Sequence, residues 1–111
     1  LAPLNRGIIA TCYAKASDSN LTTADAMSAM HDMYANEPFM VVLDGSPSVK
    51  ATLGANTVHL TVRVDERTGM VMSIAVLDNL MKGASGMAVQ NANLALGLPE
   101  VAGLPIVGVY P

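Results

Sequence analysis

Polar and small residues gather at one predicted strand-to-helix junction, and they are the first candidates for chemistry. The apolar run Met70–Leu77 predicts a strand, and a helical pattern follows to about Leu96, before Gly97 and Pro99. The free N–H groups in the first turn of such a helix attract anions and polar ligand groups. A close-packed core helix that binds nothing is the alternative. Small residues at the junction, among them Gly83, Ala84 and Gly86, would let the backbone lie close to a sheet or a ligand.

Arg6 is the second candidate, because it is a guanidinium in a polar lead-in to a predicted strand. Its planar fork can bind a carboxylate or a phosphate through two parallel hydrogen bonds. A solvated surface charge is the alternative interpretation of the same residue.

A thiolate–imidazole pair of Cys12 with His31 or His59 is the third possibility, and the sequence argues against it. Cys12 shares a face with Ile8 and Ala10 in a strand that we expect to be buried, where cysteine behaves as a small hydrophobe. Neither histidine has metal-ligand spacing with cysteine or carboxylates, so we expect no metal site.

The elements that position these residues predict an α+β fold with a mixed, largely antiparallel sheet covered by two main helices. A strand is predicted over residues 7–16, with apolar groups on both faces as in a central strand. Thr22 or Thr23 caps the first helix, whose predicted buried stripe is Ala26, Met27, Met30, Met33 and Tyr34. Further strands are predicted at 39–43, at 58–65 with one packed and one polar face, and at 70–77. Residues 49–53 are predicted to be extended, and the apolar tail 101–111 to pack on something.

Composition limits the class of protein. The chain has 111 residues, of which 51% are hydrophobic and 14% charged, and this small domain cannot hide so much apolar surface within itself. We therefore expect broad faces that meet another subunit or domain. The net charge of -3 argues against nucleic acid, and no apolar run is long enough to cross a membrane. The single cysteine fits a reducing, cytoplasmic compartment.

Three segments carry a resemblance to a known family. The segment Asp78-Asn79-Leu80-Met81-Lys82-Gly83-Ala84-Ser85-Gly86 with its continuation to Glu100, the opening Leu1–Thr11, and Gly54-Ala55-Asn56 resemble motifs of the N-acetyl-gamma-glutamyl-phosphate reductase family, in the semialdehyde-dehydrogenase group. They occur in the family's order and span essentially the whole chain. Met87 stands where the family often has Gln, and Ala55 where it often has Ser.

The resemblance implies an NADP-dependent oxidoreductase of arginine biosynthesis, which reduces an acyl phosphate to a semialdehyde with NADPH. A thiolate would form a thioester and a histidine would handle protons, and both side chains are expected upstream of Leu1. Arg6 would then bind substrate, while Asn79, Lys82 and residues 83–86 would approach the nicotinamide.

The same resemblance implies that residues 1–111 are the C-terminal dimerisation and substrate domain, inactive alone, without the Rossmann domain that holds most of the cofactor. The expected partners are that domain and further copies of the chain, which would form a dimer or tetramer through the sheet. An aspartate-semialdehyde dehydrogenase domain, with a similar Asp-Asn-Leu-x-Lys-Gly-Ala motif, and a non-catalytic oligomerisation module stay open as alternatives.

Overall fold

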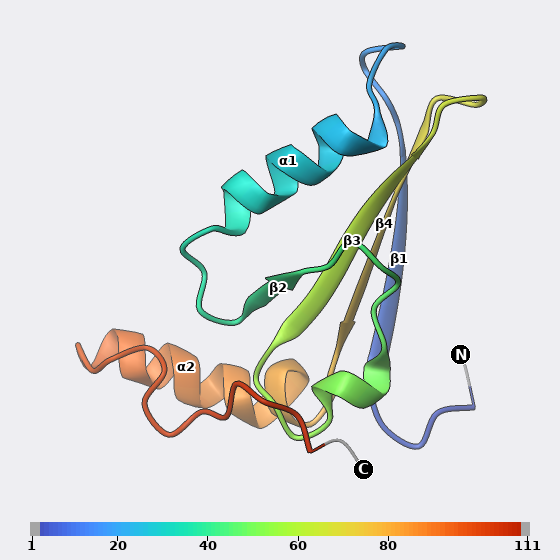
Figure 1. Cartoon of the computed structure of the whole chain (residues 1–111). Coiled ribbons are helices and arrows are strands. Elements are labelled where there is room, and N and C mark those ends of the chain that lie inside the picture. The colour runs from blue at the N-terminus through green and yellow to red at the C-terminus, as the bar shows by residue number, and fades with distance from the viewer. Residues whose placement is uncertain (1–2, 110–111) are drawn as a thin grey trace.

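Four strands form one mixed sheet in the computed structural model, which describes residues 3–109 (Figure 1). Their order is β1-β4-β3-β2, with β1 at Ile8–Lys15, β4 at Met70–Leu77, β3 at Val58–Asp65 and β2 at Met40–Val42. β4 pairs antiparallel with both β1 and β3, whereas β2 runs parallel to β3. The sequence-based prediction of an α+β fold with a mixed, largely antiparallel sheet is confirmed. The expectations for Leu1, Ala2, Tyr110 and Pro111 lie outside the described residues.

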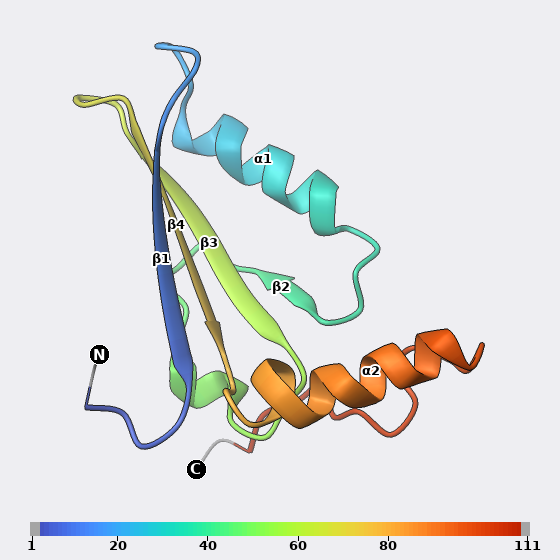
Figure 2. The same cartoon turned by 180° about the vertical axis from the view of Figure 1, so that it is seen from behind.

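Two main helices form beside the sheet, as predicted. The helix α1 spans Thr23–Tyr34 and lies along β3, while α2 spans Gly86–Ala95 and lies beyond the lower ends of the strands (Figures 1 and 2). Thr22 is the N-cap of α1, and its side chain and that of Asp25 form a reciprocal capping box. Gly97 ends the second helical segment at φ +69, a left-handed conformation that glycine adopts without strain.

The strand β1 differs from the prediction, since it is an edge strand and not a central one. All eight of its residues are exposed, including Cys12, so the expectation of a buried cysteine is wrong. The apolar groups on both faces of the strand misled the prediction. An edge strand whose faces meet another protein has the same pattern as a central strand covered by its own chain.

Three further expectations need correction. Met33, predicted in the buried stripe of α1, is 71% exposed, and only Met27 of that stripe is buried. Residues Val49–Thr52 form a 3-10 helix and not an extended segment, and the Thr52 hydroxyl donates to the Val49 carbonyl over 2.9 Å. The predicted polar face of β3 is partly covered, because Thr61 is buried and contacts Met27 of α1.

The C-terminal segment packs against the loop that precedes β3. The Asn56 N–H donates to the Pro105 carbonyl over 2.7 Å, and the Val109 N–H donates to the Leu53 carbonyl over 2.8 Å. Leu104 is buried in the small apolar core. The prediction that this tail packs on something is confirmed for its described part, and it brings the tail to the same end of the sheet as the predicted site.

Candidate functional site

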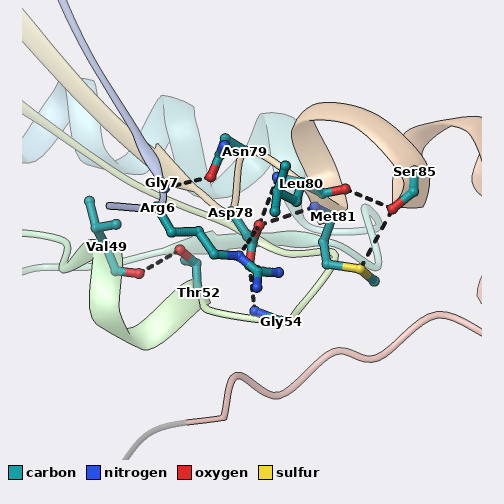
Figure 3. A network of polar contacts seen from close by, with 10 residues as sticks. All are labelled: Arg6, Gly7, Val49, Thr52, Gly54, Asp78, Asn79, Leu80, Met81 and Ser85. Carbon is teal, nitrogen blue, oxygen red and sulfur yellow. Dashed lines mark hydrogen bonds and ion pairs between the residues drawn. The ribbon is translucent and has the colours of Figure 1, made fainter. Parts of the chain in front are cut away.

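Asp78, at the end of β4, joins three segments that are far apart in the sequence (Figure 3). Its carboxylate accepts from Arg6 Nε at 3.1 Å and pairs with Arg6 Nη2 at 2.9 Å. It also accepts from the Gly54 N–H at 2.6 Å, the Leu80 N–H at 2.8 Å and the Met81 N–H at 3.1 Å. The side chain is fully buried. Arg6, Gly54 and the junction after β4 are therefore held around one carboxylate.

Asp78 occupies the place where we expected a ligand. The free N–H groups at the start of the second helix were predicted to attract an external anion, but those of Leu80 and Met81 already bind the Asp78 carboxylate. Asp78 thus acts as the anion for this turn, as acidic residues do at helix starts. It was missed as a site residue, although an Asp directly between a strand and a helix is a signal for such a cap.

The ionisation of Asp78 predicts a pH-dependent stability. Burial raises the pKa of this carboxyl, but hydrogen bonds from Gly54, Arg6, Met81 and Leu80 outweigh burial and lower the pKa from 3.8 to about 2. Because the pKa in the folded chain lies below the ordinary value, ionised Asp78 stabilises the fold fully above that value. The contribution is lost as the pH falls from about 4 toward about 2.

Urea unfolding of the wild type and of Asp78→Asn across this pH range measures the effect. The difference in unfolding free energy between the two proteins should shrink as the pH falls. The exposed carboxylates Asp25 and Asp65, whose pKa values are also lowered by hydrogen bonds from Thr22 and Thr68, contribute to both proteins and cancel. A difference that stays constant would contradict the assignment.

Asn79 ties the junction to the start of β1. Its Oδ1 accepts from the Gly7 N–H over 2.6 Å. Gly7 has φ +113 and contacts the 3-10 helix, where an added Cβ would overlap Val49. Among residues 3–109, no group accepts a hydrogen bond from Asn79 Nδ2. This amide can therefore still donate one to a ligand.

The residues Met81–Ser85 form a π-helical turn before α2, in place of the regular helix start that we predicted. The Gly83 N–H donates to the Asp78 carbonyl over 2.9 Å, and the Ser85 N–H to the Leu80 carbonyl over 3.0 Å. The Ser85 hydroxyl also donates to the Leu80 carbonyl. Gly83, Ala84 and Ser85 are exposed, so this turn presents a surface of small side chains.

Lys82 points away from that surface, into a second polar cluster. Its Nζ donates to Gln90 Oε1 over 2.6 Å and lies 5.0 Å from the centroid of the Phe39 ring. Gln90 Oε1 also accepts from Asn56 Nδ2, and Gln90 Nε2 donates to Glu100. Burial lowers the pKa of Lys82, while Glu100 and Glu37 oppose that shift. The cluster connects the π-helical turn to the C-terminal segment, and sequence reasoning missed Asn56, Gln90 and Glu100 as its members.

Comparison with known proteins identifies the family. The family model for the semialdehyde dehydrogenase dimerisation domain matches residues 1–79. The chain belongs to this family.

Several relatives of this dimerisation domain share one enzyme name. N-acetyl-gamma-glutamyl-phosphate reductases are 53% identical in Saccharopolyspora erythraea, 48% in Thermus thermophilus and 46% in Acaryochloris marina. Each match covers 100% of this chain but only 32–33% of the relative. The domain thus spans about a third of the length of the curated relatives it matches. The family resemblance drawn from the sequence is confirmed.

The dimerisation domain keeps the possible thiol and imidazole groups apart. Cys12 is aligned with Ser73 and Val62 across the sheet, whereas His59 is aligned with Val76, so the odd offset places the two side chains on opposite faces. His31 lies on the exposed side of α1. Burial lowers the pKa of His59, which contacts Thr57. Within residues 3–109 no group of three or more metal-type ligands is placed to hold an ion, and no helix is long and apolar enough to cross a bilayer.

Proposed function

We propose that this chain is the C-terminal dimerisation and substrate-side domain of an NADP-dependent reductase. That enzyme would convert N-acetyl-glutamyl 5-phosphate to N-acetyl-glutamate 5-semialdehyde in the cytoplasm, in arginine biosynthesis. The observation that carries the proposal is the meeting of three motif segments at Asp78, which brings Arg6 beside Asn79 and the small-residue turn. The substrate is inferred from relatives named N-acetyl-gamma-glutamyl-phosphate reductase.

The residues at this site fit the nicotinamide end of the cofactor. Asn79 Nδ2 can donate a hydrogen bond to a carboxamide, and the exposed small residues Gly83, Ala84 and Ser85 let a flat ring approach. Lys82 and Gly86 would not contact the cofactor but would stabilise the turn, because both are buried. Bound NADPH would supply the hydride that reduces the acyl carbon, and most of its binding would come from a separate Rossmann domain.

Arg6 would hold an oxyanion of the substrate. Two of its nitrogens face Asp78, and the side chain stays 39% exposed, so part of the guanidinium can meet a ligand. The nucleophilic cysteine and the proton-transferring histidine would come from residues upstream of Leu1.

Arg6→Lys in the full-length enzyme should raise KM for the acyl phosphate about tenfold or more, with a smaller change in kcat. Lysine keeps the charge but loses the planar fork, so ground-state binding suffers most. Steady-state kinetics on both proteins measure the two constants. Arg67→Lys is the matched control, since Arg67 is 83% exposed. An unchanged KM in Arg6→Lys would remove Arg6 from the substrate site.

Self-association is expected through the sheet. The edge strand β1 exposes Ile8, Ile9 and Tyr13 at 41%, 50% and 66%, and an open apolar edge of this kind is a pairing surface. Sedimentation of the chain at micromolar concentration should give a mass above that of the monomer. Ile9→Lys should shift the chain toward monomer, while Leu96→Lys, at a 73% exposed position beyond α2, should not. A monomeric wild type would contradict this part of the proposal.

Genetic complementation tests the proposed reaction. The full-length coding sequence should restore growth without arginine to a strain that lacks N-acetyl-gamma-glutamyl-phosphate reductase. It should not rescue a strain that lacks aspartate-semialdehyde dehydrogenase. Rescue of the second strain alone would favour the other enzyme, and rescue of neither would favour an oligomerisation module.

A further inference from the structure

The guanidinium of Arg6 has an inner and an outer edge. On the inner edge, Nε donates to Asp78 Oδ1 at 3.1 Å and Nη2 lies 2.9 Å from Asp78 Oδ2. On the outer edge, Nη1 has no partner among the described residues 3–109. A guanidinium carries five N–H donors in a rigid fork. The outer edge therefore keeps donors that the chain itself does not use.

The carboxylate that grips the inner edge is itself fixed. Asp78 is fully buried and accepts from three backbone N–H groups, those of Gly54, Leu80 and Met81. Gly54 belongs to a different segment from Leu80 and Met81, so rotation of the carboxylate would break contacts with both segments. Arg6 is consequently held in one orientation by a group that cannot turn (Figure 3).

We propose that Asp78 is a positioning residue, which fixes Arg6 so that the outer guanidinium edge binds an oxyanion of the substrate. This inference rests on the proposed function and adds the residue that orders the arginine before the ligand arrives. Ordering a side chain in advance removes part of the cost of binding. Asp78 also neutralises the charge of Arg6, so recognition depends on the direction of the free N–H groups more than on net charge.

An arginine-specific dicarbonyl, phenylglyoxal, tests the arrangement without any need for enzymatic turnover. In the full-length protein, peptide mapping should show that inorganic phosphate slows modification of Arg6 several-fold. A second arm uses N-acetylglutamate in place of phosphate, and it reveals whether the oxyanion is the phosphate that the reaction releases or the substrate carboxylate. Arg67 is the internal control and should react at the same rate with and without either anion. If neither anion protects Arg6, the proposal is overturned.

The variant Asp78→Asn tests the positioning role. With Arg6 released, protection by the anion should fall to the level of Arg67, and unchanged protection would overturn the role of Asp78. If the variant does not fold, nitrogen-15 spectra of the wild type decide. The Nε–H of Arg6 should exchange with water much more slowly than that of Arg67, and the Arg6 signals should shift on addition of the protecting anion. Equal exchange rates would overturn the proposal. Failure of the complementation test with protection intact would instead reject only the proposed reaction.

Discussion

Asp78→Ala should destabilise the chain by about 3–5 kcal/mol, because three backbone N–H donors lose their acceptor at about 1–3 kcal/mol each. The carboxylate is fully buried, and its loss leaves the N–H groups of Gly54, Leu80 and Met81 without their acceptor. A buried donor without a partner costs about 1–3 kcal/mol. Arg6 adds less, because it is partly exposed and can turn toward water. Chemical denaturation of the wild type and the variant measures the difference.

Asp65→Ala is the matched control for this prediction. Asp65 also lies at the end of a strand and accepts from Arg67 and Thr68, but its side chain is 48% exposed. Water replaces those contacts, so the substitution should change the unfolding free energy by only a small part of the Asp78 effect. Similar effects at the two positions would show that Asp78 does not hold three segments together.

Gly86→Ala should destabilise the chain by about 2 kcal/mol, although alanine is the better helix former. An added methyl group would overlap Asn56 Oδ1 and come within 2.9 Å of the Met81 carbonyl. Asn56 cannot move aside, because it is fully buried and bonded to Gln90 and to Pro105. Overpacking costs about 1–3 kcal/mol and sometimes more, which outweighs the gain of up to about 1 kcal/mol from helix propensity.

Gly83→Ala, three residues earlier, is the control that separates the steric clash with Asn56 from the higher helix propensity of alanine. Its added methyl group would meet the tips of Leu77 and Ile8 at 3.3 and 3.4 Å, where flexible side chains can yield, and the Asp78 carbonyl at 3.5 Å, an ordinary contact distance. We expect a change near zero or a slight gain in the midpoint of thermal unfolding. If Gly86→Ala is as stable as Gly83→Ala, the close approach of α2 to Asn56 is not tight.

Local patterns in the sequence predicted most of the elements. The alternation in residues 58–65, the apolar run 70–77 and the cap at Thr22 each depend on neighbours within a few residues, and all three elements form where predicted. The prediction of an extended segment at residues 49–53 was wrong, because the 3-10 helix there is short and has no periodic signal of its own. The failure at β1 has another cause, since burial depends on which molecule covers a strand and the sequence does not encode that separately.

The site was only partly predictable, because its contacts join residues that are far apart in the sequence. The motif residues Arg6, Gly54 and Asn79 could be found one by one, but only the fold shows that Asp78 joins their segments. Lys82 is a motif residue whose side-chain direction could not be predicted. Its place in the motif suggested a ligand contact, yet its side chain turns inward to Gln90. Sequence spacing does not reveal the direction of a lysine at an irregular turn.

The reverse reaction of the purified full-length protein is the most direct test of the central claim, that the Asp78 site belongs to a reductase specific for N-acetyl-glutamyl phosphate. The protein is supplied with NADP, phosphate and either N-acetyl-glutamate semialdehyde or aspartate semialdehyde, and NADPH formation is followed. We predict phosphate-dependent NADPH formation with the first substrate, at least about a hundredfold better in kcat/KM than with the second. A preference for aspartate semialdehyde, or no NADPH with either substrate, would contradict the account.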